Sequence, residues 1–144
     1  MISMQTLVQA LGGKKVFKRR IVNADELRET VKAGLPYASL EALMNKFGLD
    51  RREAADALHL PQRTFARRKK ERRLQADESD RLLRLARVGA QAEDTLGSEE
   101  KAIQWLRRPN RALGNQTPLE LMDTDIGAKQ VEDVLGRIEH GNIS

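Results

Sequence analysis

The sequence has no cysteine and very few aromatic residues. Its 144 residues include one Trp, one Tyr and three Phe, so that aromatics make up 3% of the chain. The absence of cysteine excludes disulfides and thiolate zinc sites and suits a reducing cytoplasm. The scarcity of aromatics argues against a single-strand nucleic-acid binder that stacks bases on aromatic side chains. We therefore expect a cytoplasmic protein, and we expect any nucleic acid that it binds to be double-stranded.

Long apolar runs and catalytic motifs are also missing. Apolar stretches are far shorter than the roughly 20 residues that span a bilayer, and no continuous apolar segment of the kind found in signal peptides precedes Lys14. The two histidines, His59 and His140, lack a metal-ligand spacing. The sequence has neither a glycine-rich phosphate loop nor a nucleophile elbow. We expect no enzymatic activity, no metal or cofactor, and no membrane partner.

Charge is plentiful and unevenly distributed along the chain. Charged residues make up 33% of the sequence, and the net charge is +5. Residues 93–144 contain ten acidic side chains and six lysines or arginines, whereas residues 1–92 carry the positive excess. A basic first part and an acidic second part suggest two surfaces for two partners, the first of them a polyanion. Chance drift of surface charge is the alternative, because one dense cluster supplies most of the excess.

The apolar residues recur at helical spacing along most of the chain, and no strand pattern or internal repeat is present. The sequence therefore predicts an all-α protein. A long helix is expected to begin at Asp77 or Ser79 and to end near Leu96, where a glycine follows. The other expected helix caps are Asn23, Ser39, Asp50 with Glu53 in a capping box, Ser98 and Thr117.

One stretch in the middle of the chain fits the requirements of a helix-turn-helix. Two crossing helices need a small residue where their backbones approach, and Ala55 meets this need. Leu58 and Leu60 supply apolar residues at the end of the first helix and in the turn, and Phe65 can bury the second helix against the first. The second helix, Pro61–Lys70, can then present its outer face to the major groove of DNA.

That outer face is strongly basic, with seven positive side chains and one negative between residues 63 and 73. Arginine can bond guanine O6 and N7 together, which is worth roughly 1–3 kcal/mol of discrimination. A solvated basic surface is the alternative for the charge run alone, but the apolar frame beside it favours DNA. Arg68 stands where many helix-turn-helices have an apolar residue, so it sits near the groove or the helix is slightly rotated. The expected DNA-binding residues are Arg63, Thr64, Arg67, Arg68, Lys69 and Lys70.

The acidic second part is predicted to be a small helical module. Trp105 is the only tryptophan, and it either fills the core or anchors an interface, since Trp is enriched at binding hot spots. The polar end of the chain, from Arg137 onward, indicates by itself only a frayed terminus. We expect three parts: a mobile N-terminal arm over residues 1–22, a helix-turn-helix and dimerisation domain over residues 23–92, and this module over residues 93–144.

The module resembles a known family. It is similar to the C-terminal toxin-binding domain of MbcA/ParS/Xre antitoxins, and the preceding segments Arg63–Arg68 and Glu78–Leu82 resemble the Xre-type helix-turn-helix that accompanies that domain. The resemblance extends from about residue 35 to residue 141, and the order of its pieces is specific. One departure is Asn115, where the family often has a second glycine. The segments of the module that carry the resemblance are Ala102–Leu106, Arg108–Gly114, Thr117–Met122, Gly127 and Val131–Gly141.

The resemblance implies an antitoxin of a type II toxin–antitoxin pair. Its partner would be a RES-domain toxin that depletes cellular NAD, and the C-terminal module would cover the active site of that toxin. The helix-turn-helix would bind operator DNA and repress the pair's own operon, as a homodimer or in a hetero-oligomeric complex with the toxin. Carried over by position, the toxin contacts would be Trp105, Arg108, Asn110, Arg137, Glu139 and Gly141.

Two other functions stay open on the sequence alone. The first is a transcriptional repressor whose C-terminal half only dimerises, and the second is a partition-type DNA-binding adaptor. The neighbouring gene distinguishes them from the antitoxin, because an antitoxin of this kind requires a toxic RES-type protein encoded beside it.

Overall fold

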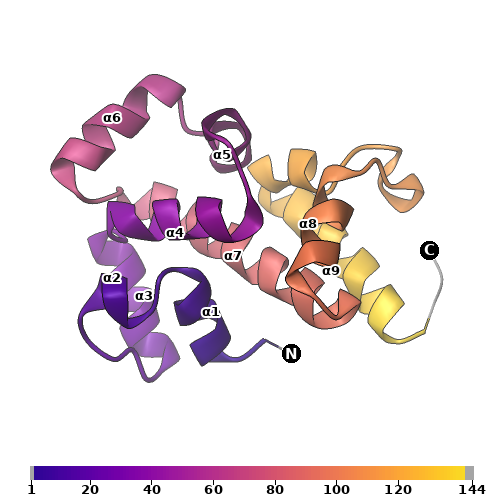
Figure 1. The fold of residues 1–144 in the computed structure, drawn as a ribbon, viewed down its shortest axis with the longest axis horizontal. Coiled ribbons are helices and arrows are strands. Elements are labelled where there is room, and N and C mark those ends of the chain that lie inside the picture. The colour runs from indigo at the N-terminus through magenta and orange to yellow at the C-terminus, as the bar shows by residue number, and fades with distance from the viewer. Residues whose placement is uncertain (1, 142–144) are drawn as a thin grey trace.

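The computed structural model describes residues 2–141, which form nine α-helices and two short 3-10 helices without a β-strand (Figure 1). The prediction of an all-α protein is confirmed. None of the described helices is both long and apolar enough to cross a membrane. The elements are α1 (Met4–Ala10), α2 (Lys14–Phe17), α3 (Ala24–Ala33), α4 (Tyr37–Phe47), α5 (Arg51–Leu58), α6 (Gln62–Glu71), α7 (Ala76–Leu96), α8 (Glu99–Arg107), η1 (Arg111–Leu113), η2 (Leu119–Asp123) and α9 (Asp125–Glu139).

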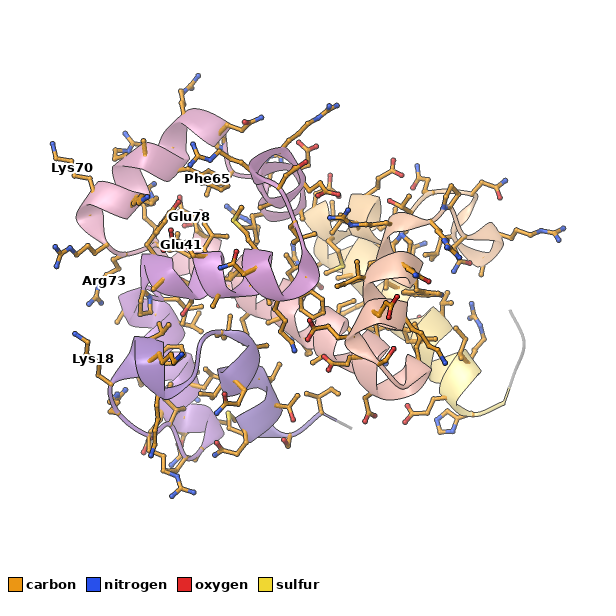
Figure 2. All side chains as sticks on the ribbon, in the orientation of Figure 1. Lys18, Glu41, Phe65, Lys70, Arg73 and Glu78 are labelled. Carbon is orange, nitrogen blue, oxygen red and sulfur yellow. The ribbon has the colours of Figure 1, made fainter. Side chains whose placement is uncertain are left out.

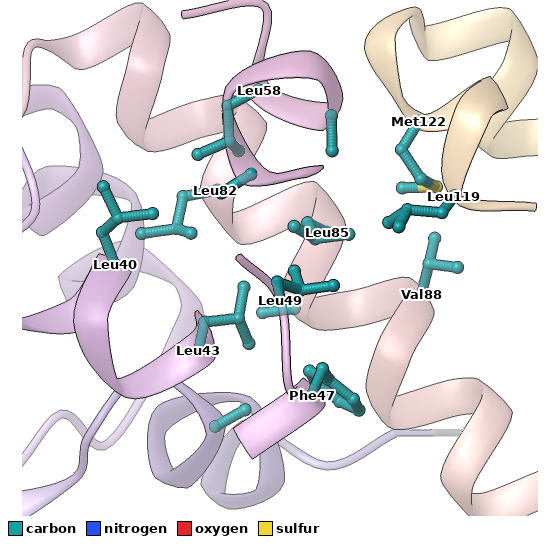
Figure 3. Packing of buried hydrophobic residues seen from close by; sticks show 14 of the residues in the cluster. Leu40, Leu43, Phe47, Leu49, Leu58, Leu82, Leu85, Val88, Leu119 and Met122 are labelled. Carbon is teal, nitrogen blue, oxygen red and sulfur yellow. The ribbon is translucent and has the colours of Figure 1, made fainter. Parts of the chain in front are cut away.

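Helix α7 is the central element of the fold. It packs against α1, α3, α4 and α5 on the N-terminal side and against α8, α9 and η2 on the C-terminal side. Figure 3 shows Leu82, Leu85 and Val88 of α7 lying between the leucines of α4 and the η2 residues Leu119 and Met122. One apolar core therefore extends through both halves of the chain. The predicted boundary between residues 92 and 93 lies within α7, and the division into domains stays a prediction.

Most of the helix ends follow the predicted caps. Asp50 and Glu53 form the expected capping box, and the side chains of Asn23 and Ser98 cap α3 and α8. Ser39 is a wrong prediction, because α4 begins two residues earlier behind Pro36, whose φ of −57° already suits a helix start. The long helix likewise begins before the predicted residues, at Ala76.

The N-terminal segment is folded, in contrast to the mobile arm expected over residues 1–22. Helix α1 packs against α4 and α7, and Val8 and Leu11 are buried. Ile21 is buried as well and joins Val8 and Leu27 in a small apolar cluster. These residues find their partners on helices that are distant in sequence, and for that reason the weak local pattern did not predict their burial.

A glycine allows α4 to pack closely against α7. A Cβ atom added at Gly89 would lie 2.6 Å from Cζ of Phe47, whose ring is itself only 2% exposed. The absence of a side chain at Gly89 therefore lets the buried ring of Phe47 lie directly against the backbone of α7.

Candidate functional site

The frame of the helix-turn-helix has the geometry that the sequence predicts. Ala55, Leu58, Leu60 and Phe65 are all buried, and they pack α5 against α6. The turn is closed by a hydrogen bond of 2.9 Å from the backbone N–H of Leu60 to the carbonyl oxygen of Ala55. His59 ends α5 in the left-handed conformation with φ of 52°. These contacts fix the direction in which α6 leaves the turn.

Helix α6 has one buried face and one exposed basic face. Thr64, Phe65 and Arg68 are buried, whereas the residues between them are exposed. Ala66 lies in the middle of the exposed face, where its small side chain allows another surface to approach closely. Figure 2 shows Lys70 extending away from the protein. The exposed face carries Gln62, Arg63, Ala66, Arg67, Lys69 and Lys70.

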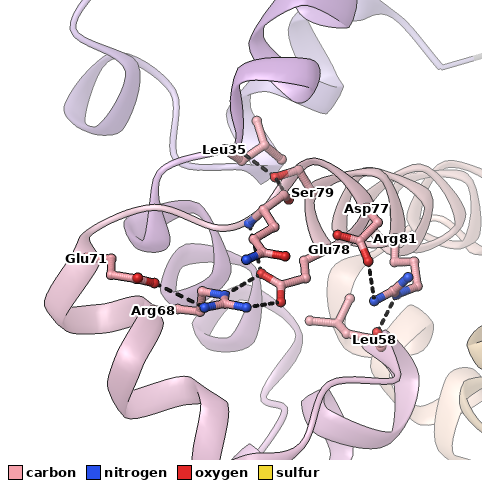
Figure 4. Close-up of polar contacts among 9 residues, drawn as sticks. Leu35, Leu58, Arg68, Glu71, Asp77, Glu78, Ser79 and Arg81 are labelled. Atoms are coloured by element: carbon pink, nitrogen blue, oxygen red, sulfur yellow. Dashed lines mark hydrogen bonds and ion pairs between the residues drawn. The ribbon is translucent and has the colours of Figure 1, made fainter.

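The guanidinium of Arg68 lies inside the protein, against the carboxylate of Glu78 (Figure 4). Its Nε donates to Oε1 over 2.7 Å and its Nη2 donates to Oε2 over 2.8 Å. Both side chains are only 6% exposed. Nη1 of Arg68 donates in addition to the carboxylate of Glu71 over 3.0 Å. All three nitrogens of the guanidinium thus donate to carboxylates of the protein, two of the bonds to buried Glu78 and one to half-exposed Glu71.

The electrostatics of this pair follow from its geometry. The hydrogen bond to Glu78 raises the pKa of Arg68 above its already high value, against the opposing effect of burial. Burial alone would raise the pKa of Glu78, but the hydrogen bonds from Arg68 and from the backbone N–H of Gln75 lower it below the usual range. Both groups are therefore charged at neutral pH and compensate each other.

Two of the predicted DNA-binding residues face inward. Arg68 cannot reach a groove while it pairs with Glu78, and Thr64 is 6% exposed on the buried face of α6. The sequence shows an arginine at position 68, where an apolar residue is usual. Its acidic partner, Glu78, lies ten positions later at the start of α7, and no local pattern pairs the two residues. Arg63, Arg67, Lys69 and Lys70 remain on the exposed face as predicted.

The predicted toxin-binding residues fall into two groups. Trp105, Arg108 and Asn110 line one surface depression of about 390 Å³ at the end of α8, together with Lys101 and Gln104. Trp105 is half-buried and packs against the core, and its part in an interface stays a prediction. The side chain of Asn110 caps η1 by accepting a hydrogen bond from the N–H of Ala112 over 2.9 Å.

The second group lies at the C-terminal end of α9. Arg137 and Glu139 are exposed in its last turn, and Gly141 follows with φ of 82°. None of the three lines the depression at Trp105. Residues 142–144 of the predicted tail lie outside the described residues.

Arginines connect the C-terminal module to the helix-turn-helix, and the sequence did not identify them. Nη2 of Arg107 on α8 donates to Glu53 over 2.8 Å, and the same nitrogen bonds the carbonyl oxygen of Gly48. Glu53 is also the residue that completes the capping box of α5. Arg84 of α7 donates to the carbonyl oxygen of Met122 in η2 over 3.1 Å. Each partner is more than 30 positions away along the chain, so no local pattern links them.

Comparisons with known proteins agree with both halves of this architecture. Residues 26–87 match the antitoxin Xre-like helix-turn-helix domain, and residues 91–141 match the antitoxin Xre/MbcA/ParS C-terminal toxin-binding domain. The first match ends and the second begins within α7, the helix that packs against elements of both halves of the chain.

Similar proteins include curated antitoxins and one solved complex. An Antitoxin Xre of Photorhabdus laumondii is 35% identical over 120 residues, which are 82% of this chain and 81% of that protein. The Prs ADP-ribosylating antitoxin of Sphingobium sp. is 29% identical over 121 residues, which are 77% of this chain and 76% of that protein. A chain in the crystal structure of the M. tuberculosis MbcT–MbcA toxin–antitoxin complex matches with a TM-score of 0.56 and 25% identity, over 85% of this chain and all of that one. The chain belongs to the Xre/MbcA/ParS family of antitoxins.

Proposed function

We propose that this antitoxin neutralises a RES-type, NAD-depleting toxin with its C-terminal module and represses its own operon by binding operator DNA through α6. Both actions are binding events, and neither requires catalysis by this chain. With a cytoplasmic toxin and the chromosome as partners, the protein acts in the cytoplasm. The observation that carries the proposal is the separation of two unlike surfaces on the two sides of α7, one basic on α6 and one at the end of α8.

The DNA-binding part of the proposal rests on the exposed face of α6. Arg63 and Lys70 lie seven positions apart on one stripe of that face, and Ala66 lies between them. Arginine is suited to guanine and lysine to phosphate, while a small residue at the centre lets the helix approach the base edges. Helix α6 is held by the Phe65 contact and by the Arg68–Glu78 pair, so that this face has a fixed orientation.

The toxin-binding part rests on the depression at the end of α8. Trp105 offers a large half-buried surface there, and exposed Arg108 stands beside it. Trp and Arg are the residues that most often supply the binding energy at protein interfaces. We include Asn110 because it shapes the turn beside the depression, and Arg137, Glu139 and Gly141 because they form the exposed end of α9 next to the described C-terminus.

Co-expression with the protein encoded by the adjacent gene tests the proposal. We expect the adjacent gene product alone to stop growth and to lower cellular NAD, and we expect this chain to restore both and to co-purify with its partner. A harmless neighbour, or a toxic neighbour that this chain neither binds nor neutralises, would refute the toxin-binding part. Binding of the purified chain to a duplex of its own promoter region tests the DNA-binding part separately.

A further inference from the structure

A second group of basic side chains lies outside both of the domains that match known antitoxins. Helix α2 and the loop after it carry five lysines and arginines within seven residues, and all five are exposed. This segment precedes residue 26, where the first match begins. We call it the basic segment; it consists of Lys14, Lys15, Lys18, Arg19 and Arg20.

Two hydrogen bonds place the basic segment beside the end of α6. Nη2 of Arg19 donates to Oγ1 of Thr30 over 3.2 Å, and Nη1 of Arg73 donates to the carbonyl oxygen of Ala33 over 3.1 Å. Thr30 and Ala33 are one turn apart on α3, a rise of about 4.5 Å along the helix. In Figure 2, Lys18 and Arg73 extend from the same edge of the molecule as Lys70 of α6. The basic surface of α6 therefore continues through Arg73 to the basic segment.

The carboxylates closest in sequence do not compensate these charges. Asp25 and Glu29 pair with Arg28, and Glu26 accepts a hydrogen bond from the backbone N–H of Val22. Within residues 2–141, none of the basic segment's side chains forms an ion pair. Like charges held near one another repel. An extended polyanion bound along this surface would relieve that repulsion and would be attracted by all five side chains of the basic segment.

We propose that the basic segment binds the phosphate backbone of the same DNA duplex whose major groove receives α6. This inference rests on the proposed DNA binding by α6 and extends it. Duplex DNA carries about one negative charge per 1.7 Å of its axis, so its backbone can follow a basic surface that continues past the recognition helix. Such contacts carry no sequence information; they fix the position of the protein and add affinity that depends on salt. The DNA site is accordingly longer than the helix-turn-helix alone would cover.

Neutralising substitutions with a matched control test the inference. Lys15→Gln, Lys18→Gln and Arg20→Gln together remove three charges from exposed side chains that make no described hydrogen bond or ion pair. The control combines Arg111→Gln and Lys129→Gln, which removes two charges from exposed residues of the C-terminal half that line neither proposed binding surface; of these, Lys129 forms one exposed ion pair, with Asp125. Full-length proteins with unchanged melting temperatures are titrated against a duplex of the chain's own promoter region at several salt concentrations, and their footprints are compared.

We expect the basic-segment variant to bind with a dependence of log affinity on log salt that is shallower by about 2 to 3, since each lost phosphate contact removes about 0.9. Its footprint should be shorter, and the control should behave as the wild type does. If the variant keeps the wild-type slope and footprint while Arg63→Ala with Arg67→Ala abolishes binding, the inference is overturned and the proposed function stands. If Arg63→Ala with Arg67→Ala also leaves binding unchanged, both are overturned.

Discussion

The buried pair of Arg68 and Glu78 ties the exposed basic helix to the central helix of the fold. Its two parallel hydrogen bonds, of 2.7 and 2.8 Å, join α6 to the first turn of α7 (Figure 4). Glu78 at the same time completes the capping box of α7 through the backbone N–H of Gln75. A single carboxylate thus fixes both the start of α7 and the position of α6. The orientation of the proposed DNA-binding face depends on this pair.

The first prediction concerns stability. Glu78→Gln removes the buried counter-charge of Arg68 and leaves only the half-exposed carboxylate of Glu71 beside the guanidinium. Breaking a buried ion pair in this way typically costs about 3–5 kcal/mol of the free energy of unfolding. Urea unfolding followed by circular dichroism measures this loss. Glu71→Gln is the matched control: its carboxylate bonds the same arginine but is 53% exposed, so its removal should cost below about 1 kcal/mol. Equal losses for the two variants would show that Glu78 has no special role.

The second prediction concerns pH. The pKa of Glu78 is lowered in the folded state, so the pair contributes its full stability above the unfolded-state pKa of about 4.3. That contribution is lost as the pH falls through the lower, folded-state pKa. The wild type should therefore lose free energy of unfolding below about pH 4 more steeply than Glu78→Gln does. Parallel stability profiles of the two proteins from pH 7 to pH 3 would contradict this assignment.

The third prediction separates the two kinds of arginine on α6. Arg63→Ala with Arg67→Ala should leave the free energy of unfolding nearly unchanged and weaken binding to the promoter duplex, by about 1–3 kcal/mol for each arginine that contacts a guanine. Arg68→Ala should instead destabilise the protein by leaving Glu78 buried and unpaired. Fluorescence anisotropy and urea unfolding on the same samples distinguish the two effects. An Arg68→Ala protein of wild-type stability would mean that this guanidinium is not buried in solution.

The sequence predicted the parts of the site that depend on neighbouring residues. Ala55, Leu58, Leu60 and Phe65 lie within eleven positions, so their spacing alone specifies how two short helices cross. Arg68 was placed on the wrong face because its partner Glu78 reaches it only through the tertiary fold. The burial of Leu11 and the link from Arg107 to Glu53 were missed for the same reason, since both depend on helices far apart in sequence. The spacing of apolar residues predicts which face of a helix is buried. It does not identify the side chain, distant in sequence, that compensates the charge of a buried arginine.

The fourth prediction concerns the core. Gly89→Ala places a methyl group 2.6 Å from Cζ of Phe47 and should destabilise the protein by about 1–3 kcal/mol despite the better helix propensity of alanine. Gly136→Ala on α9 is the control, because a Cβ atom there would meet nothing within 4 Å. That substitution should stabilise the protein by up to about 1 kcal/mol. Thermal unfolding of both variants measures the difference, and stabilisation by Gly89→Ala would disprove the close packing of α4 on α7.

If the chain carries two separable binding surfaces, each can be inactivated without the other. Growth rescue from the adjacent toxin and binding to the promoter duplex, measured on the same two variants, test this separation. Arg63→Ala with Arg67→Ala should still rescue growth but bind the duplex much more weakly, whereas Arg108→Glu should bind the duplex but not rescue growth. Rescue by Arg108→Glu, or loss of both activities in either stably folded variant, would contradict the separation.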